Sequence, residues 1–133
     1  MTTRHASCSC GQLRVHCEGE PIRISMCHCL ACQRRTGSVF GVQARFPRAN
    51  ITSDGRSATF KRKADSGNTI TFHFCPDCGA TVFWTIDAQP ELIAVAVGAF
   101  ADPLFPEPRF SVFESKRHGW TTRPDDLELE HLA

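Results

Sequence analysis

The sequence carries almost no net charge, and this excludes several classes of binding protein. Its 133 residues include 15 Lys and Arg and 14 Asp and Glu, so its formal net charge is +1. Without a charge excess, bulk electrostatic binding to nucleic acid or to an anionic membrane is not expected. Two basic clusters, Gln33-Arg34-Arg35 and Lys61-Arg62-Lys63, are short, and runs of this size are typical of a solvated face.

Long apolar runs are missing as well. No stretch approaches the ~20 apolar residues that a membrane-spanning helix needs. The first six residues, Met1-Thr2-Thr3-Arg4-His5-Ala6, lack the apolar run of a signal peptide. We therefore expect a cytoplasmic protein without membrane contact. In a reducing compartment, eight clustered cysteines are typical of metal binding or catalysis rather than of disulfides.

Helical patterns, internal repeats and linkers are scarce, whereas strand patterns are frequent. Residues 69–74 and 109–113 alternate between apolar and polar, and residues 92–97 form an apolar run typical of a strand buried on both faces. One short helix is expected over residues 30–35, ending at Gly37. With 41% hydrophobic residues available for a core, we expect one mainly β domain over residues 1–133.

Seven of the eight cysteines fall into three tight groups. These are Cys8-Ser9-Cys10-Gly11, Cys27-His28-Cys29-Leu30-Ala31-Cys32 and Cys75-Pro76-Asp77-Cys78-Gly79. A C-x-x-C turn aims two sulfurs at one tetrahedral centre, and C-x-C does so from an extended strand because residues i and i+2 share a face. Three such groups in one short chain indicate a zinc protein.

The number of cysteines predicts two different zinc sites. A closed structural zinc takes four ligands, and Cys8, Cys10, Cys75 and Cys78 supply four. Three neighbouring cysteines then remain, which is the ligand number of a catalytic zinc with one open position: Cys27, Cys29 and Cys32. Pairs could be exchanged between the sites, but locality favours this partition.

Two residues could close the second site. His28 lies between two of its ligands, although in an extended C-x-C it would point to the opposite face. Its position also makes it a candidate general base. Cys17 lies outside all three groups, in an alternating segment where a lone cysteine is more often a small buried hydrophobe.

The spaced set C-x-C-G, C-H-C-x-x-C-Q-R-x-T-G-S and F-C-x-x-C-G resembles the glutathione-dependent formaldehyde-activating enzyme family, which also includes centromere protein V. The resemblance continues through Val97-Gly98-Ala99-Phe100 and Trp120 to Pro124-Asp125-Asp126-Leu127. It implies a β-tent fold of zinc-pinned antiparallel sheets and the same division into structural and catalytic cysteines. The implied activity is that of a carbon–sulfur lyase, which condenses glutathione with formaldehyde. The oligomeric state stays open, and a homodimer is compatible with the sequence.

The implied chemistry needs positive charge beside the open zinc. Three thiolates and Zn²⁺ sum to a net charge of −1, and zinc deprotonates a coordinating thiol. Arg34 and Arg35 follow the ligand loop and could pair with the carboxylates of glutathione, or could lie in solvent as surface residues. Four aromatic residues could wall a pocket, although core packing is the more frequent use: Phe40, Phe83, Trp84 and Phe100.

Two other functions are compatible with parts of the pattern. A non-enzymatic zinc module that binds a protein partner would require His28, Cys17 or a partner residue to complete the second site. A methionine sulfoxide reductase shares the β-tent scaffold but requires a nucleophilic cysteine outside the metal groups. No cysteine follows Cys78, and the segment around Ser111 offers only a serine.

Overall fold

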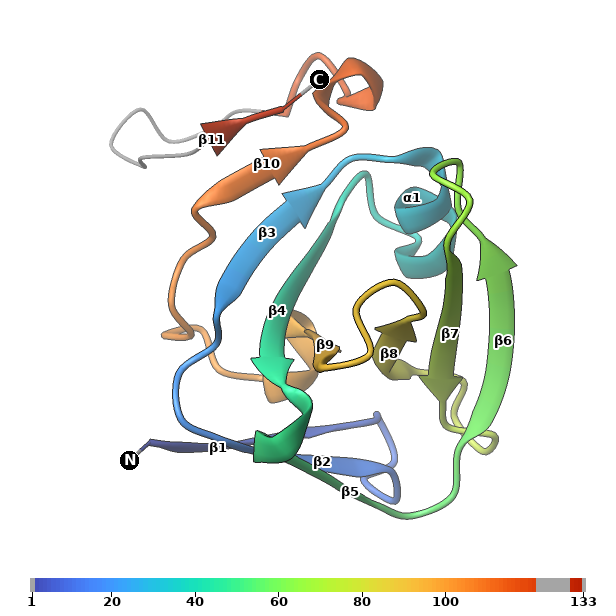
Figure 1. Ribbon diagram of the computed structural model, residues 1–133, viewed down its shortest axis with the longest axis vertical. Coiled ribbons are helices and arrows are strands. Elements are labelled where there is room, and N and C mark those ends of the chain that lie inside the picture. The colour runs from blue at the N-terminus through green and yellow to red at the C-terminus, as the bar shows by residue number, and fades with distance from the viewer. Residues whose placement is uncertain (1, 122–129, 133) are drawn as a thin grey trace.

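The computed structural model describes residues 2–121 and 130–132, and these form two β-sheets and one α-helix (Figure 1). The smaller sheet is antiparallel and has the order β1-β2-β5. Its strands are β1 (Thr3–Ser7), β2 (Arg14–Glu18) and β5 (Ile51–Asp54). The segment Pro124–Leu127, which contributed to the family resemblance, lies outside the described residues.

The larger sheet has eight described strands in the order β11-β10-β3-β4-β9-β8-β7-β6. They are β3 (Arg23–Cys27), β4 (Gly41–Pro47), β6 (Ala58–Lys63), β7 (Thr69–Phe74), β8 (Thr81–Ile86), β9 (Leu92–Ala96), β10 (Phe110–Val112) and β11 (Glu130–His131). In this spatial order, neighbouring strands pair antiparallel from β3 through β4, β9, β8 and β7 to β6. The strand β10 instead runs parallel to both of its neighbours, β3 and β11. The predicted mainly β fold with one short helix is confirmed.

The individual strand predictions match the structure closely. The alternating segments became β7 and β10, and the continuous apolar run became β9, whose three central residues are buried. Three short 3₁₀ helices connect strands: η1 (Arg48–Asn50), η2 (Val97–Phe100) and η3 (Glu114–Lys116). No helix in the described ranges is long and apolar enough to cross a membrane.

The helix α1 (Leu30–Thr36) begins and ends where the sequence predicts. The Cys29 sulfur caps its first turn by accepting a hydrogen bond from the Cys32 amide at 3.3 Å. Gly37 ends it in the left-handed region at φ 74°, and its amide donates to the Gln33 carbonyl at 2.8 Å. Because L side chains disfavour this conformation, glycine is the suitable residue there.

The larger sheet has two unlike faces, because residues paired across neighbouring strands share a face. One face packs on the small sheet and forms the main core, which includes Phe46, Val95, Leu13 and Val15. The opposite face carries a smaller cluster, whose buried residues are Phe72, Trp84 and Ala94. Cys27 pairs with Gly41 on this second face, which we call the site face, since it also carries the catalytic candidates described below.

We expect Phe46→Ala to lower the free energy of unfolding by about 3–5 kcal/mol, because truncating a buried aromatic leaves a cavity. Phe46 is fully buried and its ring lies 6.3 Å from that of Phe100. Phe60→Ala is the matched control, since Phe60 is 60% exposed on the edge strand β6. Phe60→Ala should lower the free energy of unfolding by less than about 1 kcal/mol. Urea unfolding measures both, and equal losses would contradict the described core.

Candidate functional site

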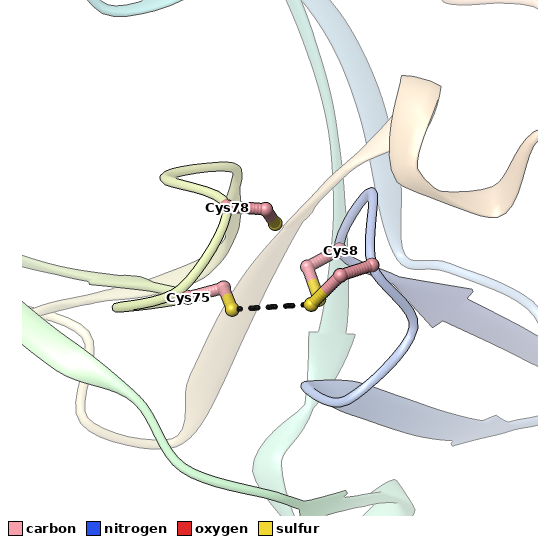
Figure 2. A group of neighbouring side chains, drawn as sticks. Cys8, Cys75 and Cys78 are labelled. Carbon is pink, nitrogen blue, oxygen red and sulfur yellow. Dashed lines mark hydrogen bonds between the residues drawn. The ribbon is translucent and has the colours of Figure 1, made fainter.

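The first cysteine group joins the two sheets. Cys8 and Cys10 lie in the turn after β1, and Cys75 and Cys78 lie in the turn after β7. Figure 2 shows the sulfurs of Cys8, Cys75 and Cys78 directed toward one another from these two turns. All four sulfurs lie within 4.8 Å of one another. The structure therefore brings together the four cysteines that the sequence assigned to one closed site.

The sulfur spacing fits a metal ion. The Cys10 sulfur is 3.6 Å from that of Cys8 and 3.7 Å from that of Cys75. A disulfide would need about 2.05 Å. Sulfurs at the corners of a tetrahedron, each about 2.3 Å from a central zinc ion, are about 3.8 Å apart. The two Cys10 contacts thus have the separation that a shared tetrahedral ion requires, and the remaining sulfur pairs lie within 4.8 Å.

Gln12, which the sequence analysis overlooked, supports this group. Its amide nitrogen donates to the Cys75 sulfur at 3.0 Å and to the Arg56 carbonyl at 2.7 Å, while its amide oxygen accepts from the Arg56 amide at 2.9 Å. Burial raises the pKa of Cys75, but hydrogen bonds from Gln12 and nearby backbone amides outweigh it and bring the pKa to about 6. A thiol with this pKa is largely thiolate at neutral pH, which is the form that binds metal.

The second group is assembled within one short stretch of chain. Cys27 ends β3, Cys29 caps α1 and Cys32 lies in the first turn of α1, and their sulfurs lie within 4.8 Å of one another. Hydrogen bonds from the thiols of Cys27 and Cys32 hold the pKa of Cys29 far below its usual range. The same sulfur contacts raise the pKa of Cys27. Cys29 is also the most exposed of the three.

Neither residue that could close this group belongs to it. His28 is fully buried, and its Nε2 lies 3.1 Å from the hydroxyl of Ser111 on β10. Cys17 is buried in the main core, and burial raises its pKa to about 12. Among the residues whose side chains the structure describes, which are 2–121, 130 and 132, these three sulfurs form a group without a fourth ligand.

Gln33 ties the ligand loop to the segment after β10. Its amide nitrogen donates to the carbonyl of His28 at 2.9 Å and to that of Lys116 at 3.2 Å. Its amide oxygen lies 3.0 Å from Nε2 of His118. Both glutamines directly follow a cysteine motif, at the C-G-Q and C-Q positions. That adjacency is the sequence signal that could have identified them.

The structure separates the two arginines that the sequence proposed for substrate binding. The Arg35 guanidinium stacks over Trp84 at 4.4 Å and lies 5.7 Å from the centroid of Phe72. Its Nη2 is only 2.9 Å from the point that a Cβ on Gly41 would occupy, and the Cβ of Cys32 is 3.7 Å from the same point. Arg35 therefore lies beside the three cysteines, in space that Gly41 leaves open. Arg34 is exposed.

Arg62 is a second cation at this place, from a cluster expected to be a solvated face. Its guanidinium lies 5.6 Å from the ring centroid of Phe72, and its charge contributes to the lowered pKa of Cys29. Lys61 and Lys63 are exposed, as expected, whereas Arg62 is half-buried. In the described part of the chain, neither Arg62 nor Arg35 forms an ion pair with a carboxylate.

The four aromatic residues divide between core and site. Phe83 and Phe100 belong to the main core, as core packing predicted. Phe40 lies 5.9 Å from the ring of His28. Trp84 is buried on the site face, where its ring supports Arg35. Trp84 is therefore the aromatic residue placed to shape the site.

Comparisons with known proteins agree with the cysteine pattern. A family model for the glutathione-dependent formaldehyde-activating enzyme matches residues 3–116. A Penicillium rubens protein, provisionally named a glutathione-dependent formaldehyde-activating enzyme, is 24% identical over 140 residues, which cover 96% of this chain and 73% of the fungal one. The crystal structure of a Rhodobacter sphaeroides protein shares the fold, with a TM-score of 0.58 and 17% identity over 77% of this chain and 91% of that one. Because the family match covers most of its length, this chain belongs to the glutathione-dependent formaldehyde-activating enzyme family.

Proposed function

We propose that this protein is a zinc-dependent carbon–sulfur lyase that binds a small thiol, such as glutathione, at Cys27, Cys29 and Cys32 and joins it to an aldehyde such as formaldehyde. The observation that carries the proposal is a group of three sulfurs within 4.8 Å, with no fourth ligand among the side chains of residues 2–121, 130 and 132. A zinc ion with three protein ligands keeps one position for a substrate. The names of the family and of the fungal relative support the choice of thiol and aldehyde.

The four-cysteine group has a structural role in this proposal. Cys8, Cys10, Cys75 and Cys78 supply a complete tetrahedral set, so a zinc ion there has no position for a substrate. The ion would join the β1–β2 turn to the β7–β8 turn and thereby hold the two sheets together. Two zinc ions per chain are therefore expected, one structural and one catalytic.

The residues around the second group suit thiol chemistry. When bound, zinc supplies a thiolate at neutral pH and holds it in place. Arg35 and Arg62 offset the negative charge of three cysteine thiolates, and Arg35 can pair with a substrate carboxylate through its planar guanidinium. Gln33 fixes the loop that carries the cysteines. Of the two arginines that the sequence suggested for substrate binding, the geometry favours Arg35 over Arg34.

The open coordination position also distinguishes this proposal from a non-enzymatic zinc module. Such a module needs a complete second site, supplied by His28, by Cys17 or by a residue of a partner protein, and the first two have other roles. His28 faces Ser111, and Cys17 lies in the main core. Ser111 is itself fully buried, so it offers no exposed nucleophile of the reductase type.

A mild chelator should remove one zinc ion per chain while the protein stays folded, because the three-ligand site lacks the fourth protein ligand that strengthens the other site. Cys29→Ser should abolish binding of this labile ion only. Cys10→Ser should instead destabilise the fold, since structural zinc binding contributes folding free energy. Metal content and thermal unfolding measure these effects. Loss of both ions together with unfolding would contradict the division into two sites.

Glutathione should bind at the second zinc through sulfur and change the absorption spectrum of the cobalt-substituted protein. S-methylglutathione, which has no ionisable thiol, should change the spectrum far less. Arg35→Ala should weaken glutathione binding by ~1–3 kcal/mol if Arg35 pairs with a carboxylate. Arg34→Ala is the matched control and should have an effect below about 0.5 kcal/mol. An unchanged cobalt spectrum together with no acceleration of formaldehyde consumption would refute the proposed function.

Cys17→Ala should retain two zinc ions and normal activity, because the Cys17 side chain is buried in the main core and belongs to neither sulfur group. Metal analysis of the purified variant tests this directly. A fall to one zinc ion would identify Cys17 as a fourth ligand, and the second site would then be closed.

A further inference from the structure

A strip of polar residues leads along the site face to the three cysteines. Alternate residues of a strand share a face, and paired residues on neighbouring strands lie side by side. Three consecutive pairs of this kind connect β3 with β4: Arg23 with Arg45, Ser25 with Gln43, and Cys27 with Gly41. We call Arg23, Ser25, Gln43 and Arg45 the β3–β4 strip. It ends at Cys27, a member of the proposed catalytic group.

The strip contains buried polar atoms for which no described residue supplies a hydrogen-bond partner. Nε of Arg23, Oγ of Ser25 and Nε of Arg45 are buried and have no hydrogen-bond partner among the described residues. Nε of Arg35, on the same face, is also buried and has no hydrogen-bond partner among the described residues. The large majority of buried side-chain polar atoms in native proteins are hydrogen-bonded, to protein or to ordered water. Four such atoms on one face indicate a place where a polar ligand or water completes the hydrogen bonding.

The charge of the strip indicates which kind of ligand fits. Arg23 and Arg45 lie directly opposite each other, and like charges in that position are destabilising. Neither forms an ion pair with a carboxylate in the described residues. Arg23 instead stacks on the Phe110 ring at 4.0 Å, and Arg45 donates to the Gln89 side chain at 3.3 Å. A bound carboxylate would relieve the repulsion and accept hydrogen bonds from both guanidinium groups.

The surface is hollowed beside Arg45. A shallow depression is lined by Arg45, Trp84, Ile86, Gln89, Leu92 and Ala94. Ala94 lies between Arg45 and Trp84 in the same row of paired residues, so its small side chain forms the floor. Adjacent strands are about 4.8 Å apart, which places Arg45 and Trp84 about 10 Å from each other across the sheet. Arg45 and the Arg35 guanidinium that stacks on Trp84 therefore flank the depression.

We propose that the β3–β4 strip binds an acid group of the substrate that is remote from its sulfur. The preferred substrate is then an elongated thiol with two acid groups, one for Arg35 and one for Arg45. Gly41 and Arg45 are four positions apart on β4, which is about 13 Å along the strand. The Arg45 side chain can reach over part of this distance, so that a ligand of tripeptide length can span the rest. This inference rests on the proposed function, because it assumes that the thiol binds at the three cysteines.

The test compares ligands with one and with two acid groups in the full-length zinc or cobalt protein. Arg45→Met removes the charge but keeps an unbranched apolar side chain, and Arg45→Lys keeps the charge. Arg14→Met is the matched control, since Arg14 is exposed on β2 in the other sheet. Glutathione and 3-mercaptopropionate are titrated into the cobalt protein. S-methylglutathione, which keeps both acid groups, is titrated into the zinc protein by calorimetry.

We expect Arg45→Met to weaken binding of glutathione and of S-methylglutathione at least tenfold, and to change binding of 3-mercaptopropionate less than twofold. Arg45→Lys should recover part of the loss, and Arg14→Met should change nothing. Without ligand, the melting temperature of Arg45→Met should be unchanged or higher, because a like-charge contact is removed. This last readout separates binding from a purely structural role.

Two results would overturn the inference. Equal losses for glutathione and 3-mercaptopropionate would mean that Arg45 acts through the fold, and unchanged glutathione binding would mean that only water occupies the strip. If no thiol alters the cobalt spectrum of the unmodified protein, the proposed function fails. The S-methylglutathione affinities of the unmodified protein and of Arg45→Met then decide the role of the strip separately, since that ligand needs no bond to the metal.

Discussion

The rest of the structure depends on the convergence of four sulfurs from two distant turns. Cys8 and Cys10 extend from the small sheet and Cys75 and Cys78 from the large one, and their spacing of 3.6–3.7 Å in the contacts made by Cys10 suits a single tetrahedral ion. Six strands, β2 to β7, separate the two turns in the sequence, yet the sulfurs meet in space where the two sheets pack. Cys8 and Cys75 belong to the main core, so the proposed structural zinc would fix that core at the place where the two sheets meet.

The two faces of the large sheet separate stability from chemistry. Alternation along β3 places Ile24 in the main core and Cys27 on the site face, and alternation along β4 does the same for Phe46 and Arg45. The main core can therefore be dry and tightly packed. The opposite face carries guanidinium groups that stack on aromatic rings. It also carries buried polar atoms without hydrogen-bond partners among the described residues, which a packed apolar core would not tolerate.

Local features of the structure could be predicted from the sequence because short-range physics determines them. The extent of α1 follows from Cys29 as its cap and Gly37 as its left-handed end. The strands β7 and β9 follow from alternating and continuous apolar patterns. Ligand spacing likewise identified the C-x-C and C-x-x-C pairs and the three-cysteine group, since these motifs bring sulfurs together within a few residues. The number of ligands, rather than spacing, assigned Cys8 and Cys10 to one site with Cys75 and Cys78, and the packing of the sheets brings these two pairs together. Family membership followed from the same motifs.

The sequence by itself thus determined the fold class, the helix and the cysteine groups. Only the tertiary structure decided which charged and polar side chains join them. Arg35 rather than Arg34 lies beside Cys32, because helix geometry turns adjacent residues about 100° apart and Trp84 supports only one of them. Arg62 reaches the same place from the edge strand β6. The pairing of Arg23 with Arg45 depends on strand register, which is set by packing across the whole sheet and leaves no signal in either segment alone.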